Sequence, residues 1–205
     1  MSLLAADPSF RGFLRTLRRA KGREQVAGAV DQLVAAGVLG EPEAVASVLT
    51  VMGRNKHIEE AIELVHRLAD PNVVTYNTLI KACNLARDPD LGKAIEVFDE
   101  MEAAGVTPNV VTYNILIRAC DNAGDLGKAI AVFDEMEAAG VTPDVVTFTT
   151  LVKACDTAGD LDKALEVRAE MKAAGLTPTP SGRRRRQQPD RGVRQRRGPR
   201  QGGTW

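Results

Sequence analysis

Polar and basic residues recur at fixed positions in three stretches of the chain, and their types suit them to bind a ligand. Each stretch opens Val-Val-Thr, places a polar residue three positions after its second valine, and places a lysine or arginine four positions later. At 100° per residue these positions share one side of a helix. They form either a column of hydrogen-bonding groups beside positive charge or an ordinary solvated face. The column comprises Val74, Asn77 and Lys81, then Val111, Asn114 and Arg118, then Val146, Thr149 and Lys153.

Other residues with catalytic or metal-binding potential are not arranged for either role. Cys83, Cys120 and Cys155 hold equivalent places in successive units without a C-x-x-C pair, so we expect small, reduced core residues. The histidines, His57 and His66, have no cysteine nearby, and we expect both on solvated faces. The sequence shows no nucleophile elbow, phosphate-binding loop or HExxH motif. It therefore predicts that the chain is not an enzyme and holds no metal or cofactor.

The three stretches belong to one unit written three times, over residues 73–109, 110–144 and 145–179. The second and third units have 35 residues, and the first has two more, in the segment NLARDPD. A fixed period in this range indicates a solenoid.

Each unit reads as two helices. In the middle unit an apolar stripe with helical spacing is followed by Gly124 and Asp125, which suit a helix stop and a new N-cap. A second apolar stripe then runs to Gly140. A hairpin of this kind buries its stripes only by stacking on its neighbours, so the pattern predicts an all-α solenoid. The stripes are Tyr113, Leu116, Ile117 and Cys120, then Leu126, Ala129, Ile130, Phe133 and Met136.

This unit resembles the pentatricopeptide repeat. The shared features are V-V-T-Y-N at its start, A-G-D-L at the hairpin turn, F-x-E-M on the second helix and G-V-T-P-[ND] at its end. The 34-residue tetratricopeptide repeat fits less well, because its Trp and Leu-Gly signature is missing. The resemblance implies a right-handed α-solenoid that binds single-stranded RNA at one base per repeat on its concave first-helix face. It also implies an organellar protein acting in RNA stability, processing or translation.

The resemblance further implies which residues read bases. The fifth and last residues of each repeat would do so, and Val74, Val111 and Val146 would sandwich the base. Asn77 with Asn109 resembles a pyrimidine reader favouring cytosine, and Asn114 with Asp144 one favouring uracil. Thr149 with Thr179 departs from the family pattern, so no base is assigned. Asn109 and Asp144 also precede helices, where such residues commonly cap, and both roles can coexist.

The N-terminal region is less regular. Residues 1–41 contain a basic run and read as a worn repeat, with Phe13, Leu14 and Leu17 on one helix and Val26, Val30 and Leu33 on its partner. The alternative is the remnant of an organellar presequence, since transit peptides are Arg-rich and amphipathic. Residues 42–72 read as a degenerate repeat, with Val48, Leu49, Ala61, Val65 and Leu68 at core positions.

Charge is distributed unevenly along a chain whose formal net charge is zero. Residues 180–205 hold nine Arg against one Asp, a balance of +8, which leaves −8 on residues 1–179. We expect this tail to be disordered, and it acts either as an electrostatic RNA clamp or as an unstructured end. Acidic runs such as Asp134-Glu135-Glu137 are expected on the convex side.

The sequence shows no membrane span. Aromatic residues make up 4% of the chain, too few for a base-stacking platform.

Two other interpretations stay open. A helical-repeat scaffold could hold a protein partner on the same concave surface. Alternatively, the chain could be a fragment of a longer repeat protein, because three to five repeats would read only three to five bases.

Overall fold

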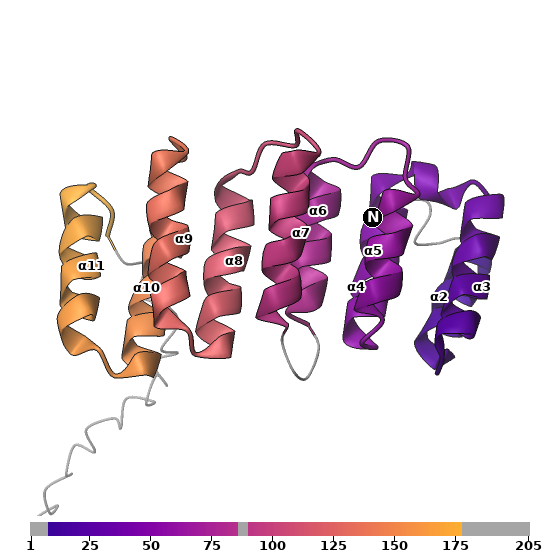
Figure 1. Ribbon diagram of the computed structural model, residues 1–205, viewed down its shortest axis with the longest axis horizontal. Coiled ribbons are helices and arrows are strands. Elements are labelled where there is room, and N and C mark those ends of the chain that lie inside the picture. The colour runs from indigo at the N-terminus through magenta and orange to yellow at the C-terminus, as the bar shows by residue number, and fades with distance from the viewer. Residues whose placement is uncertain (1–7, 86–89, 178–205) are drawn as a thin grey trace, which may run out of the picture.

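The computed structural model describes residues 8–85 and 90–177, which form ten α-helices and one short 3₁₀ helix, η1 (Val38–Gly40) (Figure 1). Thr179 and the Arg-rich tail lie outside these described residues. The helices come in pairs: α2 (Pro8–Arg19) with α3 (Arg23–Ala35), α4 (Pro42–Arg54) with α5 (Ile58–His66), α6 (Val73–Cys83) with α7 (Leu91–Ala103), α8 (Val110–Ala123) with α9 (Leu126–Ala138), and α10 (Val145–Ala158) with α11 (Leu161–Ala173).

The pairs stack into two layers along one axis (Figure 1). We call the even-numbered helices first helices and the odd-numbered ones second helices. Successive first helices pack side by side, α2 on α4, α4 on α6, α6 on α8 and α8 on α10. The second helices α5, α7 and α9 each also contact the first helix of the following pair. This arrangement confirms the predicted all-α solenoid.

Capping residues fix where each hairpin turns. Gly124 ends α8 with φ 71°, and the backbone N–H of Asp125 donates to the carbonyl of Cys120 at 3.0 Å. The side chain of Asp125 then accepts from the backbone N–H of Lys128 at 3.0 Å and starts α9. Gly159 and Asp160 repeat this geometry between α10 and α11. The stop and start signals predicted for these turns are therefore confirmed.

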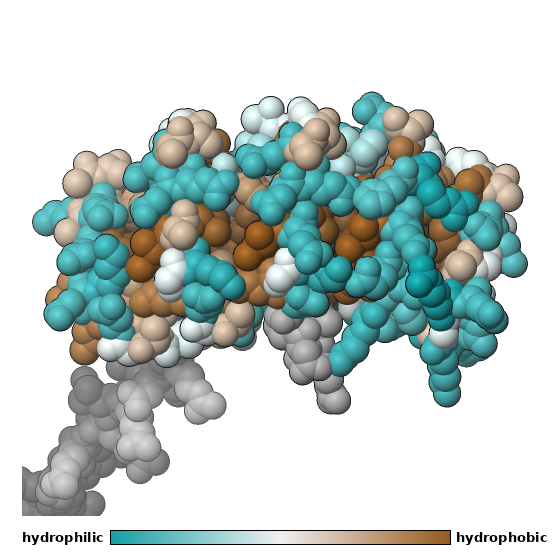
Figure 2. Space-filling view, viewed as in Figure 1, coloured by the Kyte–Doolittle hydropathy of each residue, from teal (hydrophilic) through white to brown (hydrophobic). Residues whose placement is uncertain are grey.

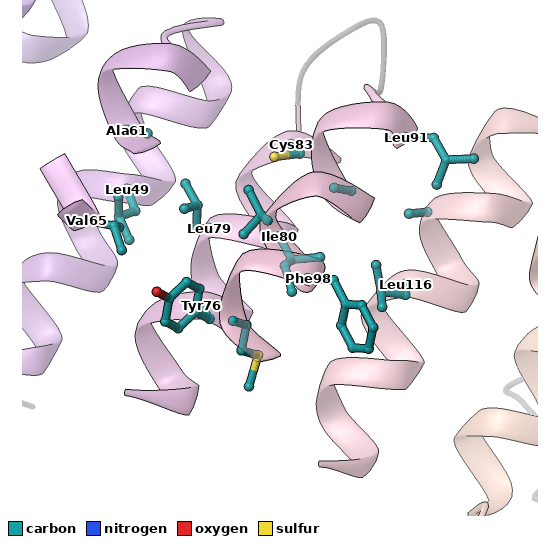
Figure 3. Close-up of a cluster of buried hydrophobic side chains, with 14 of the residues drawn as sticks. Leu49, Ala61, Val65, Tyr76, Leu79, Ile80, Cys83, Leu91, Phe98 and Leu116 are labelled. Carbon is teal, nitrogen blue, oxygen red and sulfur yellow. The ribbon is translucent and has the colours of Figure 1, made fainter. Parts of the chain in front are cut away.

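The core runs continuously along the array between the two layers. Figure 3 shows part of it, where Leu79 and Ile80 of α6 lie between Leu49 of α4 and Phe98 of α7. Aromatic rings connect neighbouring hairpins edge to face. The rings of Phe98 and Tyr113 have centroids 5.6 Å apart, and those of Phe133 and Phe148 5.7 Å apart, both pairs at 61°. Such pairs add about 0.5–1.5 kcal/mol beyond the area that they bury.

The first hairpin packs somewhat differently from the prediction. Leu17 is fully buried, as are Val26, Val30 and Leu33 of α3 to within a few per cent. Phe13 and Leu14, however, are only partly buried. Both pack against the core, and Phe10 is buried in addition, because α2 begins at Pro8 and the apolar stripe starts one turn earlier than we predicted. In the second hairpin Val48, Leu49, Ala61 and Val65 are buried, and Leu68 is partly buried.

Candidate nucleic-acid interface

Three valines project from the first-helix layer at equivalent positions. Val74, Val111 and Val146 are 53%, 51% and 52% exposed, whereas most other large apolar side chains of these helices are buried. Each follows the first residue of its helix, just after the N-cap that opens it. A single exposed valine needs no explanation. Three in register give the layer a repeated apolar contact point.

Asn114 and Asp144, which stand 30 positions apart in sequence, are hydrogen-bonded to each other. Asn114 Nδ2 donates to Asp144 Oδ1 at 3.2 Å, and Asn114 Oδ1 accepts from Thr147 Oγ1 at 2.7 Å. Asp144 caps α10 by accepting from the backbone N–H of Thr147 at 2.9 Å. The structure thus brings the two residues together across the junction between α8 and α10.

Both side chains retain hydrogen-bonding capacity. An amide nitrogen carries two hydrogens and a carboxylate has two oxygens, so Asn114 Nδ2 and Asp144 can each form further bonds. Burial acts to raise the pKa of the Asp144 carboxyl, but hydrogen bonds from Thr147, Asn114 and Val146 outweigh it and lower the pKa. Asp144 is therefore an ionised acceptor at neutral pH, held in a fixed orientation.

The equivalent pair one hairpin earlier, Asn77 and Asn109, is arranged differently. Asn109 is exposed, and its Oδ1 caps α8 by accepting from the backbone N–H groups of Val111 and Thr112 at 3.0 and 3.1 Å. Asn77 is only 9% exposed, and its Oδ1 has no hydrogen-bond partner within the described structure. A buried amide oxygen without a partner is costly. Asn77 is thus less accessible than Asn114 and not engaged as Asn114 is.

The basic residues of the column also differ from one another. Lys81 and Arg118 are exposed on α6 and α8. Lys153 is paired instead with Asp121 of the preceding hairpin, whose carboxylate is 2% exposed and also accepts from Thr157 Oγ1 at 3.3 Å. Lys153 therefore ties α10 to α8, a role that its sequence position did not predict. A groove of about 690 Å³ lined by Arg118, Asp121 and Lys153, among others, lies at this junction.

Thr149 differs from its two asparagine counterparts. It is exposed on α10, but its Oγ1 donates to the backbone carbonyl of Val145 at 2.6 Å. The hydroxyl therefore remains available mainly as an acceptor.

The repeated part of the chain matches a known protein family. Residues 54–182 match the family model described as the pentacotripeptide-repeat region of PRORP. The chain belongs to the pentatricopeptide-repeat family. No curated protein matches the chain significantly.

Solved pentatricopeptide-repeat structures align over most of the chain. The maize protein PPR10 is 28% identical with a TM-score of 0.61, and the match covers 82% of this chain and 24% of PPR10. PPR10 in complex with an 18-nt psaJ RNA element is 27% identical with a TM-score of 0.60, and the match covers 86% of this chain and 29% of that one. The PPR domain of Arabidopsis thaliana PRORP1, in complex with tRNA, is 26% identical with a TM-score of 0.55, and the match covers 67% of this chain and 74% of that domain. The chain thus spans about a quarter of PPR10.

The second helices of the pentatricopeptide-repeat array carry most of its acidic side chains. Figure 2 shows a largely hydrophilic surface over α7 and α9. Asp99, Glu102, Asp134, Glu135 and Glu137 are exposed there, and Glu100 is partly buried. Burial, together with the nearby charges of Glu102 and Asp99, raises the pKa of Glu135. The acidic runs therefore lie on the layer opposite the valines.

The three cysteines are fully buried and free. Burial raises the pKa of the Cys83 thiol to about 12 and that of Cys120 to about 11. This fits the core role predicted for them, because unreactive thiols are protonated ones. No group of three or more metal-ligating side chains occurs within residues 8–85 and 90–177, and no helix there is long and apolar enough to cross a membrane.

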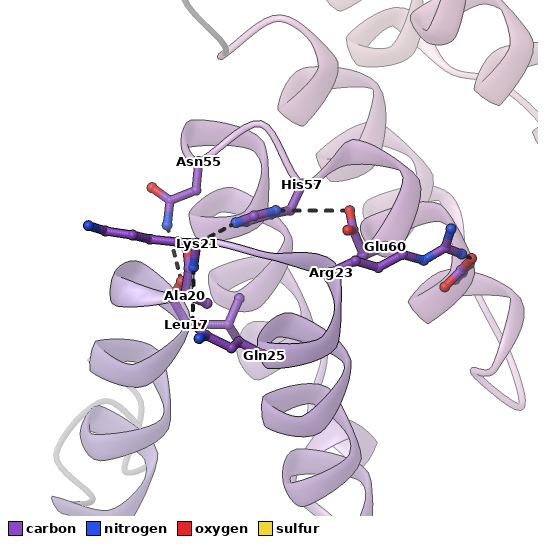
Figure 4. A network of polar contacts seen from close by, with 9 residues as sticks. Leu17, Ala20, Lys21, Arg23, Gln25, Asn55, His57 and Glu60 are labelled. Atoms are coloured by element: carbon purple, nitrogen blue, oxygen red, sulfur yellow. Dashed lines mark hydrogen bonds and ion pairs between the residues drawn. The ribbon is translucent and has the colours of Figure 1, made fainter.

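The histidine prediction is wrong for His57. Its side chain is 13% exposed, with Nε2 3.4 Å from the carbonyl oxygen of Ala20 and Nδ1 4.0 Å from Glu60 (Figure 4). Asn55 assists by donating to the carbonyl of Leu17 at 3.1 Å. Both residues follow α4 and reach the C-terminal end of α2, a long-range contact that spacing does not reveal. His66 is exposed and lies 2.6 Å from Glu100.

Proposed function

We propose that this pentatricopeptide-repeat chain binds single-stranded RNA sequence-selectively, with one base read by each of the repeats 73–109, 110–144 and 145–179. The observation that carries the proposal is the set of three half-exposed valines in register, each near a polar residue on the same helix. The structures of PPR10 and of the PRORP1 domain in complex with RNA support it.

The middle repeat has the clearest reading chemistry. Val111 offers an apolar surface to the face of a base, and Asn114 with Asp144 offers donors and acceptors to its edge. The two polar groups hold each other in place, so little side-chain entropy is lost when a base binds. Lys81 and Arg118 on neighbouring first helices can neutralise phosphates.

The bases assigned to the repeats follow from the family resemblance. Asn114 with Asp144 favours uracil and Asn77 with Asn109 favours cytosine, while the third repeat has no assigned base. Reading by Asn77 would require its buried Oδ1 to gain a partner from the base, which would also satisfy an otherwise unpaired oxygen. The proposed setting is organellar, where the protein would act in transcript stability, processing or translation as a binder rather than as an enzyme.

Base reading at the middle repeat can be tested with one substitution and a matched control. Asn114→Thr should shift the preference of this repeat from uracil toward guanine, and one good hydrogen-bonding readout is worth about 1–3 kcal/mol of discrimination. Gln32→Thr makes a similar amide-to-hydroxyl change at an exposed position of α3, in the second-helix layer, and should leave the preference unchanged.

The measurement is the affinity for four short RNAs that differ only at the base facing this repeat, found first by selection from a randomised single-stranded pool. Equal affinities for all four RNAs, with and without the substitution, would show that Asn114 does not read a base. Failure to bind any RNA, together with retention of a peptide by the same surface, would favour a protein scaffold.

A further inference from the structure

The N-terminal end of the array carries an unusual concentration of positive charge. Residues 8–23 contain six Lys and Arg and no Asp or Glu. The corresponding stretch of the middle repeat, residues 111–126, contains one basic and two acidic residues. The positive charge of α2 and of the turn that follows it therefore has no counterpart in the middle repeat.

Burial shows how α2 is registered against the other first helices. Phe10 and Leu17 are buried in α2 at the spacing of Tyr113 and Cys120 in α8, and Gly22 caps α3 at the spacing of Asp125 before α9. In this register Arg11, Arg15 and Arg18 take the places of Asn114, Arg118 and Asp121. The two polar positions of the column are thus arginines in α2, and Pro8 stands at the valine position.

Arg18 takes the place of Asp121 but does not form the ion pair that Asp121 forms. Asp121 is buried against Lys153 of the next first helix. Arg18 stands in its position and is exposed. No ion pair involves Arg15, Arg18, Arg19 or Lys21 in the described part of the chain, where Arg23 and Arg67 nearby are paired with Glu63 and Asp31.

Two contacts between hairpins hold the turn between α2 and α3, next to these cations. Arg18, Arg19, Lys21, Asn55 and His57 line a hollow of about 600 Å³ at the turn between α2 and α3. Asn55 and His57 contact the carbonyl groups of Leu17 and Ala20, which fixes the end of α2 against the turn between α4 and α5 (Figure 4). Figure 2 shows hydrophilic side chains projecting at this hairpin-turn edge of α2–α5.

We propose that Arg15, Arg18, Arg19 and Lys21 form a phosphate-binding anchor that holds the sugar–phosphate backbone of the RNA beyond the base-reading repeats, independently of sequence. This inference rests on the proposed function. Guanidinium groups match phosphate geometry, and contacts to phosphate position a strand without specifying its sequence. The α2–α3 hairpin also lacks the residues proposed to read a base, since Pro8 and Arg11 stand at the positions of Val111 and Asn114.

A lipid surface is a poorer match for the same charges. A basic amphipathic helix binds a bilayer by inserting its apolar face. In α2 that face is in the core, with Phe10 3% and Leu17 0% exposed. The cations alone remain available, and a phosphodiester strand continuing from the neighbouring repeats presents the matching charges at short range.

The anchor is tested by the triple variant Arg15→Gln, Arg18→Gln, Arg19→Gln in the full chain. Its control is Lys128→Gln, Lys163→Gln, Lys172→Gln, which removes the same charge from second helices. Binding is measured between 50 and 200 mM salt on an RNA with the preferred middle base and homopolymer flanks, and on its mismatched twin. Thermal unfolding checks that both variants are folded, which the exposure of Arg15, Arg18 and Arg19 favours.

Loss of three phosphate contacts should reduce the slope of log affinity against log salt by about 2, since single strands give about 0.7 per contact. The arginine variant should then lose roughly 20-fold less affinity than the parent across this salt range. The ratio of matched to mismatched affinity should stay the same, and the control should keep the parent's slope.

Three outcomes would overturn the inference. A slope equal to that of the control, with base preference intact, refutes the anchor and leaves the proposed function standing. Absence of RNA binding by the parent chain refutes both. Binding of the parent to phosphatidylserine vesicles that the triple variant loses, while the RNA slopes are equal, assigns the cations to a lipid surface instead.

Discussion

Replacing Gly53 by alanine should push α4 and α6 apart. A Cβ at Gly53 would lie 2.7 Å from the Cα, Cβ and carbonyl oxygen of Ala82 on α6. Ordinary carbon contacts are about 3.5–4.0 Å, so the two helices would have to separate by about 1 Å. Overpacking of this kind costs about 1–3 kcal/mol, whereas alanine gains about 1 kcal/mol over glycine within a helix. The net effect should be a destabilisation of up to about 2 kcal/mol.

Gly28→Ala is the matched control, because Gly28 lies inside α3 and a Cβ there would meet nothing within 4 Å. It should stabilise the protein by up to about 1 kcal/mol. The helix-propensity term is common to both variants, so their difference of about 1–3 kcal/mol isolates the close approach. Urea unfolding followed by circular dichroism gives this difference, and amide exchange shows whether α4 and α6 open first. If Gly53→Ala stabilises the protein as much as Gly28→Ala does, the close packing inferred at Ala82 is wrong.

Three further effects should be measurable. Lys153→Gln should destabilise the protein by about 1–2 kcal/mol in thermal or urea unfolding, because the buried carboxylate of Asp121 loses its ion pair and keeps only the hydrogen bond from Thr157. Arg118→Gln at the equivalent position should be near neutral. Burial raises the pKa of the Cys83 thiol to about 12. Its stabilising contribution is therefore complete below the unfolded pKa of about 9 and is lost as pH rises toward the folded pKa. The Cys83→Ala variant should accordingly lose less stability than the parent protein between about pH 8 and pH 10. Amide exchange should be fastest in α11, whose outward side chains have no following hairpin within the described chain, and slower exchange there than in α8 would contradict this.

Regular features of the repeats were predictable because they are local. The apolar stripes, Gly124 and Asp125 encode helix faces and ends within a few residues of one another, and the structure has them as predicted except that Val132, and not Ile130, packs against the core. The exposure of Val111 follows from the same periodicity, since a residue two positions before Tyr113 points away from the core. Repetition strengthened each of these inferences, because independent copies of one pattern agree.

Contacts between hairpins were harder to predict. The ion pair of Lys153 with Asp121 was not predicted, because Asp121 stands 32 positions earlier and only the stacking of α8 on α10 brings the two together. The burial of Asn77 and the contact of His57 with Ala20 depend on the same inter-hairpin geometry. Helical periodicity specifies which side a residue faces but not how closely the next hairpin approaches it.

The edge-to-face ring pairs have a consequence for how such a chain changes length. The pairs at Phe98 and Phe133 agree to 0.1 Å in centroid separation and share the same angle, so the aromatic contact that joins one hairpin to the next is the same at both places. A tandem duplication of 35 codons would add a unit whose two joints already fit, without any redesign of the interior. Arg168 occupies the corresponding place in α11, so a unit added after it would meet a mismatched joint. A new unit is therefore expected to fit between hairpins joined by these ring pairs better than directly after α11.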